Sequence, residues 1–171
     1  LALYGEQGRW DEVVRLKRRQ LELATTDSQR VELLPELAEL LASKLGEKTK
    51  AARVYMQALE LRADDRKILM RLMQLYSDEK DWGRLVEIIL KFTDLVDDRE
   101  RLARYYLTAA QLCDKHLDRP DEAIDYYEQA LEHDPTLALA LDGLMTLRGD
   151  RGEWVGLEQS LKRVLAKLPE G

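Results

Sequence analysis

The chain has 171 residues, of which 45% are hydrophobic and 35% are charged, and its formal net charge is −6. This length is sufficient for a sizeable buried core. The acidic balance argues against nucleic acid as a partner, because proteins that bind nucleic acid present basic surfaces. No hydrophobic run approaches the roughly 20 residues that span a bilayer, so we expect no membrane insertion.

Apolar residues recur at helical spacing, helix-favouring residues dominate, and no stretch alternates as a strand does. Leu33, Leu37, Leu40 and Leu41 illustrate the helical period. We therefore predict an all-α fold of about ten helices. In chain order, the expected helices span residues 1–7, 10–24, 28–45, 48–62, 65–79, 82–96, 98–117, 120–133, 136–149 and 153–168.

Aspartate residues, alone or followed by proline, mark several of the expected helix starts. An aspartate there can cap the free amides of the first turn and meets the positive end of the helix, and proline is tolerated in the first turn. The four signals are Asp64-Asp65, Asp97-Asp98, Asp118 followed by Pro120, and Asp134-Pro135.

Pro35 does not fit this simple pattern, because it falls inside the helix expected over residues 28–45. A proline in a helix interior removes one backbone hydrogen bond and clashes with the preceding turn. We expect the helix to kink there; the alternative is that residues 28–34 form a separate turn.

The chain contains an internal repeat, and its three tryptophans mark it. Trp10, Trp82 and Trp154 are equally spaced, since 82 − 10 = 72 and 154 − 82 = 72. The same shift superposes many apolar and small residues without a gap, which is typical of preserved packing. Among the aligned pairs are Ala38 with Ala110, Leu40 with Leu112, Ala51 with Ala123, Tyr55 with Tyr127, Ala58 with Ala130, and Leu72 with Leu144.

The segment from Ala123 to Pro135 carries an alanine, an aromatic residue four positions later, an alanine three after that, and a proline five further on. This pattern resembles the second half of a tetratricopeptide repeat, a helical pair of about 34 residues. The chain departs from the family because tryptophan here opens the second helix instead of lying in the first. Lys80 also replaces the turn glycine found at Gly8 and Gly152.

Within the 72-residue register the repeat divides into a 34-residue and a 38-residue unit. The position of Pro135 one register earlier is Ala63; from there to Asp97 is 34 residues, and from Asp97 to Pro135 is 38. We expect one repeat domain over residues 1–171, and the chain to be a fragment of a longer array. The expected units are 1–24 (partial), 25–63, 64–97, 98–135 and 136–171.

The resemblance implies a right-handed superhelical solenoid of antiparallel helix pairs, in which the first helices line a concave groove that holds a peptide or helix of a partner protein. Burial in the core is the alternative for Leu37 and Leu40. The groove residues carried over from the resemblance are Leu37, Leu40, Lys44, Met70, Arg71, Gln74, Tyr105, Thr108, Leu112, His116 and Asp142.

The sequence offers little for catalysis or metal binding. Cys113, His116 and His133 are the only residues of their types, and they lack the local spacing that metal sites need. Cys113 has no oriented base to activate it, and a single cysteine is compatible with the cytosol and excludes an internal disulfide. We expect no catalytic residue, no metal and no cofactor.

These observations favour a non-catalytic scaffold that binds a protein or peptide. Two alternatives remain open at this point. The array could be a docking or regulatory region of a larger multidomain protein, or a module for self-association into a homo-oligomer through an exposed end of the array.

Overall fold

In the computed structural model, residues 9–168 are described, and within that range the chain forms nine α-helices and no strand. This confirms the all-α prediction. The helix expected over residues 1–7 lies outside the described residues. None of the described helices is both long enough and apolar enough to cross a membrane.

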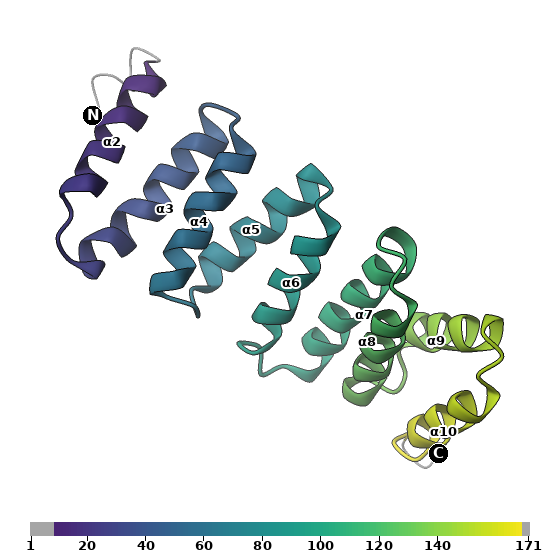
Figure 1. The fold of residues 1–171 in the computed structure, drawn as a ribbon. Helices are drawn as coiled ribbons and strands as arrows, with labels where there is room; N and C mark the ends of the chain where they lie inside the picture. The colour runs from purple at the N-terminus through teal and green to yellow at the C-terminus, as the bar shows by residue number, and fades with distance from the viewer. Residues whose placement is uncertain (1–8, 169–171) are drawn as a thin grey trace. The chain divides into compact units, whose positions relative to one another are not determined.

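The chain divides into two compact units, residues 1–81 and 82–171. In the first unit, each helix packs against the next one in the chain (Figure 1). The helices of this unit are α2 (Trp10–Leu23), α3 (Asp27–Ser43), α4 (Lys48–Leu61) and α5 (Arg66–Glu79).

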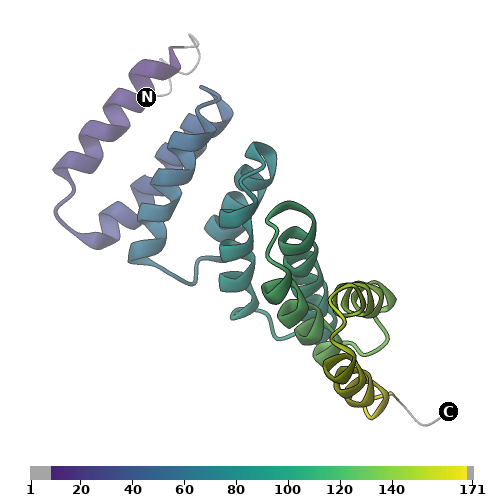
Figure 2. The ribbon, with the colours of Figure 1, turned by 45° about the vertical axis from the view of Figure 1, so that its right-hand side comes forward.

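The second unit follows the same principle, and the α7–α8 pair forms its most extensive helix contact (Figure 2). In addition to α9, the last helix also contacts α8. The helices of this unit are α6 (Trp82–Thr93), α7 (Arg99–His116), α8 (Pro120–His133), α9 (Ala138–Asp150) and α10 (Trp154–Leu165).

Small side chains lie at the centres of the helix contacts in both units, where they allow backbones to approach closely. The alanines matched by the 72-residue shift are fully buried in both copies. Large apolar residues fill the space between them, including Leu41 and Leu72 in one unit and Tyr127 and Leu144 in the other. The fully buried alanines are Ala38, Ala51, Ala58, Ala110, Ala123 and Ala130.

Several predicted helix starts are confirmed. Each tryptophan is the first residue of its helix. The Asp65 side chain accepts hydrogen bonds from the amides of Lys67 and Ile68, and Asp98 accepts one from the amide of Arg101. Pro120 occupies the first position of α8. The capping chemistry expected at Asp65 and Asp98 is therefore present. Asp118 does not cap α8, whose N-cap residue is Arg119 and makes no side-chain cap hydrogen bond.

The prediction for Asp134 and Pro135 is wrong. Asp134 ends α8 instead of capping the next helix, and α9 begins only at Ala138. The Asp134 carboxylate accepts hydrogen bonds from both the amide and the hydroxyl of Thr136, at 3.0 and 2.6 Å. This local turn satisfies the polar groups that a helix cap would otherwise use, so the next helix starts later.

Pro35 lies inside a continuous helix, because α3 runs without interruption from Asp27 to Ser43. The alternative of a separate turn over residues 28–34 is therefore excluded. The start of α3 is fixed by Thr26, whose hydroxyl accepts a hydrogen bond from the amide of Gln29.

Four turns that follow first helices share one backbone conformation. Lys80 and Gly152, which are 72 residues apart, have φ angles of 57° and 68°. Gly46 and Asp118, also 72 apart, have φ angles of 67° and 52°. All four lie in the left-handed region that favours glycine, so the repeat preserves the turn conformation even where it does not preserve the residue.

Candidate partner-binding surfaces

An apolar groove of about 700 Å³ lies in the first unit, and we refer to it as the α3 groove. Its floor is apolar, and charged residues lie along its rim. Residues from α2, α3, α4 and α5 contribute to it: Val13, Lys17, Pro35, Glu36, Glu39, Leu40, Tyr55, Lys67, Ile68 and Arg71.

Two ion pairs cross the rim of the α3 groove. Lys17 of α2 bonds to Glu36 of α3. On the other side, Arg71 of α5 contacts both carboxylate oxygens of Glu39, each at 3.3 Å. These pairs join the helices on both sides of α3, while Lys67 adds a further cation to the rim.

Glu39 also fixes the buried aromatic residue of this unit. The Tyr55 hydroxyl donates a 2.8 Å hydrogen bond to the Glu39 carboxylate. The pKa of the Tyr55 phenol is raised well above its usual value, mainly by burial and secondly by the hydrogen bond to this carboxylate. Glu39 therefore ties α4 and α5 to α3 at the edge of the groove, which makes this wall of the groove well defined.

The residues predicted for the concave groove occupy different environments in the first unit. Leu40 and Arg71 line the α3 groove. Leu37, one helical turn before Leu40, is only 3% exposed and belongs to the core. Met70 is 57% exposed and is not among the groove residues. Gln74 is exposed and accepts a hydrogen bond from Arg71 at 3.4 Å.

In the second unit the predicted residues also differ in exposure. Leu112 is buried, and Tyr105 is half-buried with its ring edge-on to Phe92 at 5.2 Å. Thr108 and Asp142 are exposed, although the Thr108 hydroxyl bonds to the carbonyl of Arg104. Of these residues, Thr108 and Asp142 are therefore accessible, while Leu112 is a packing residue.

Lys44 and His116, the two remaining predicted residues, contact tryptophans. The Lys44 ammonium lies 4.9 Å from the ring centre of Trp10, and the His116 ring stacks on Trp82 at 4.6 Å. Lys44 and His116 are equivalent, since 116 − 44 = 72. In both copies, the end of the long first helix thus covers the tryptophan of the preceding helix, a contact that the sequence pattern did not predict.

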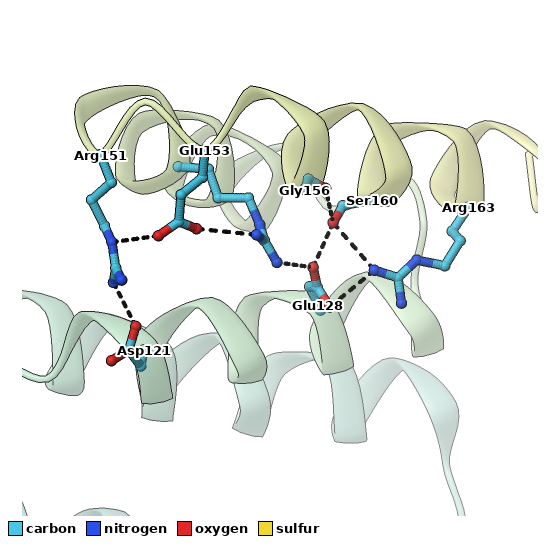
Figure 3. Close-up of polar contacts among 8 residues, drawn as sticks. Asp121, Glu128, Arg151, Glu153, Gly156, Ser160 and Arg163 are labelled. Atoms are coloured by element: carbon cyan, nitrogen blue, oxygen red, sulfur yellow. Dashed lines mark hydrogen bonds and ion pairs between the residues drawn. The ribbon is translucent and has the colours of Figure 1, made fainter.

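A polar cluster connects α8 to α10 in the second unit, and Figure 3 shows its residues. The Glu128 carboxylate accepts hydrogen bonds from Ser160 at 2.5 Å, Arg148 at 2.7 Å and Arg163 at 3.2 Å. Arg148 also bonds to Glu153 at 3.2 Å. Glu128 and Arg148 are largely buried, so these charge-assisted bonds act in an environment of reduced screening.

The same contacts set the protonation of Glu128. Burial alone would raise the pKa of its carboxyl group. The hydrogen bonds from Ser160 and Arg148 outweigh burial and hold the pKa of Glu128 below its usual value. Glu128 is therefore a carboxylate at neutral pH, and it acts as a structural anchor for the last helix.

A comparison of the two registers would have found this cluster. The residues one register before Glu128, Arg148 and Ser160 are apolar or aromatic: Met56, Tyr76 and Ile88. At most other matched positions the repeat keeps apolar residues. At these three positions, polar residues that are hydrogen-bonded to one another replace them. Such a coordinated exchange indicates a contact, because isolated polar residues at buried positions would be unfavourable.

The one cysteine of the chain lies in the interior of the second unit. Cys113 is fully buried. Burial raises the pKa of its thiol to about 11, with a smaller contribution from Glu122, so the reactive thiolate is scarce at neutral pH. No group of three or more His, Cys, Asp or Glu residues in the described part of the chain could hold a metal ion.

Comparisons with known proteins agree with this architecture. The tetratricopeptide repeat model matches residues 36–65 and 103–137. The ends of the two matches are one register apart, since 137 − 65 = 72. The first match covers the second half of α3 and all of α4, and the second covers most of α7 and all of α8. No curated protein sequence matches the chain.

Among solved structures, MamA proteins have similar folds. A MamA structure from strain AMB-1 has a TM-score of 0.54 and 18% identity over 98% of this chain and 92% of its own. Another MamA crystal structure has a TM-score of 0.50 and 16% identity over 96% and 91%. MamA from Desulfovibrio magneticus RS-1 has a TM-score of 0.49 and 16% identity over 96% and 89%.

The two segments that match the tetratricopeptide repeat support a general role in protein–protein interaction, and the likeness to MamA supports the fold. The resemblance stated from the sequence is thereby confirmed at the level of the family. The chain contains segments that match the tetratricopeptide repeat, across the α3–α4 and α7–α8 helix pairs.

Proposed function

We propose that the α3 groove binds an apolar segment of a partner protein, in helical or extended form, and that the chain acts as a non-catalytic scaffold. The observation that carries this proposal is the combination of an apolar floor and a charged rim within one groove. Binding sites for peptide segments use apolar pockets for affinity and a few polar groups for orientation.

The floor suits one or two large apolar side chains. Leu40 is half-buried, and Pro35 beside it is rigid and half-buried as well. Val13 and Ile68 form the base of the groove and are themselves buried in the core. A preformed apolar floor of this kind loses little conformational entropy on binding, which favours affinity.

The rim favours a segment that also carries an acidic residue. Lys17, Lys67 and Arg71 supply three positive charges, against two negative charges from Glu36 and Glu39. Because Glu36 and Glu39 are already engaged by Lys17 and Arg71, Lys67 remains as the cation best placed for a carboxylate of the ligand. Electrostatic complementarity of this type sets orientation and association rate more than affinity.

Peptide display against the folded chain tests this proposal. Peptides selected on the parent protein would be measured by titration against Leu40→Gln, which makes the floor polar, and Lys67→Glu, which reverses the rim charge. We expect Leu40→Gln to weaken binding by about tenfold or more. Acidic peptides should also bind Lys67→Glu more weakly.

Met70→Gln is the matched control, because Met70 lies on α5 close to Lys67 in sequence and is exposed but does not line the groove. Circular dichroism would first establish that each variant is folded. If selected peptides bind Leu40→Gln and the parent equally well, or lose affinity for Met70→Gln instead, the α3 groove is not the binding site.

A further inference from the structure

A polar groove of about 570 Å³ lies in the second unit and is lined by residues of α6, α7 and α8; we call it the α6–α8 groove. Three carboxylates line it, from Glu87 of α6, Asp94 just after α6 and Asp125 of α8, against one cation, Lys91. The three carboxylates are exposed, and none has an ion-pair partner among the described residues. A fourth, Glu128, is already bonded to Arg148 and Arg163. The chain therefore leaves an excess of negative charge in this groove uncompensated.

Two tyrosine rings complete the α6–α8 groove. Tyr106 of α7 and Tyr126 of α8 both line it and are half-buried. The residues one register earlier are Leu34 and Val54, so the packing of the repeat does not require an aromatic ring at either position. A guanidinium group can stack on an aromatic ring and pair with a carboxylate at the same time. The groove is therefore suited to arginine side chains.

Two charges of the α6–α8 groove are reversed in the first unit. Arg15 of α2 stands where α6 has Glu87, since 87 − 15 = 72, and Arg53 of α4 stands where α8 has Asp125, since 125 − 53 = 72. Both arginines are exposed. Arg53 and Asp125 lie on helices that pack against a neighbouring helix on either side. Their exposure is therefore not a consequence of where the chain begins or ends.

Two further arginines lie beside Arg15 on α2. Arg18 and Arg19 are three and four residues beyond it, which places all three on one side of the helix. Both are exposed, and only Arg19 has an ion-pair partner, Glu22 at 2.8 Å. We call Arg15, Arg18, Arg19 and Arg53 the arginine face. Within one chain, a surface of four arginines and a groove of carboxylates and tyrosines thus occupy equivalent places in the two units.

We infer that the arginine face of one copy of the chain binds the α6–α8 groove of a second copy. Its guanidinium groups pair with the free carboxylates of the groove and stack on the rings of Tyr106 and Tyr126. The contact joins two different surfaces, so each copy keeps one of each kind, and association continues into open chains or closes into rings. This inference goes beyond the proposed function, because the arginine face and the α6–α8 groove share no residue with the α3 groove.

Sedimentation velocity of the intact chain over a concentration series, in low and in high salt, tests the inference. The parent should associate in low salt and dissociate in high salt, because salt screens ion pairs at a solvent-accessible contact. One variant, Arg15→Glu with Arg53→Glu, reverses the arginine face, and another, Glu87→Arg with Asp125→Arg, reverses the groove. Each alone should raise the dissociation constant by about tenfold or more, because like charges then meet. An equal mixture of the two variants should associate again, since the first keeps its groove and the second keeps its arginine face.

Arg101→Glu with Arg104→Glu is the matched control, because it changes the net charge as much as the first variant does, at exposed positions of α7 outside both surfaces. It should associate as the parent does, and circular dichroism establishes that every variant is folded. The inference is overturned if the parent is monomeric at every concentration in low salt, if either reversed variant associates as tightly as the parent, or if their mixture stays monomeric. A monomeric parent that binds RNA, with binding lost in the first variant, would assign the arginine face to a polyanion instead.

Discussion

Lys80 is expected to destabilise the chain through its backbone, and replacing it with glycine should relieve this. Its φ of 57° lies in the left-handed region, where its equivalent Gly152 has a φ of 68°. A residue with a β-carbon is destabilised by about 1–2 kcal/mol in the left-handed conformation. Substitution by glycine removes this strain, but it also makes the unfolded chain more flexible, which offsets about 0.4–1 kcal/mol of the gain in stability.

The net expectation for Lys80→Gly is that the free energy of unfolding rises by about 0.5–1 kcal/mol. For a chain of this size that corresponds to a rise in Tm of about 1–4 °C. The turn itself should be unchanged, since the Lys80 amide bonds to the carbonyls of Tyr76 and Ser77 through the backbone alone. Urea unfolding followed by circular dichroism measures the difference, and an unchanged m-value shows that the transitions are comparable.

Two control variants separate backbone from side chain. Lys80→Ala removes the charged side chain but keeps the β-carbon, so it should leave stability nearly unchanged. Gly46→Ala introduces a β-carbon at an equivalent φ of 67° with no atom within 4 Å of it, so it should destabilise through the backbone alone. If Lys80→Ala stabilises as much as Lys80→Gly, the explanation from the left-handed conformation is refuted.

Gly143→Ala should lower the free energy of unfolding by about 1–3 kcal/mol, because the new β-carbon would lie 2.3 Å from the ring of buried Tyr127; Gly83→Ala, which meets no atom within 4 Å, is the control in the same urea assay. Glu128→Ala should cost about 1–3 kcal/mol, since it leaves Arg148 and Ser160 without their shared acceptor, and the loss should change little with salt because Glu128 and Arg148 are largely buried; a loss that disappears in high salt would contradict a buried ion pair. The Cys113 thiol, whose pKa is raised from 9.0 to about 11, should react with Ellman's reagent at pH 8 only as the protein opens, whereas an exposed Thr108→Cys thiol reacts at once. Because the folded pKa is the higher one, the stabilising contribution of Cys113 is complete below pH 9 and is lost as the pH rises towards 11, which unfolding curves of the parent and Cys113→Ala would reveal.

The fold could be predicted from the sequence because its determinants are repeated. Periodicity located the helices, and the 72-residue shift identified the alanines, such as Ala51 and Ala123, that prove fully buried. Helix ends were harder to predict. At Asp134 a local turn closed by Thr136 competes with helix capping, and the sequence motif is the same in both cases.

The candidate sites were only partly predictable. Leu37 and Leu40 lie one turn apart on the same apolar stripe, and periodicity alone does not say which of them a neighbouring helix covers. The structure places Leu37 in the core, at 3% exposure, and Leu40 in the lining of the groove, where it is half-buried. In the sequence, Glu128 and Arg148 each look like a residue on a solvent-exposed helix face. The structure shows that they belong to one cluster, because their side chains are hydrogen-bonded to each other.

The three tryptophans can serve as intrinsic fluorescence probes of the chain. Trp10 lies under an ammonium group, Trp82 is stacked on an imidazole, and Trp154 is open to water. Their emission therefore differs in wavelength and in sensitivity to quenchers. Three variants that each retain a single tryptophan would report separately on α2, α6 and α10, without any added dye.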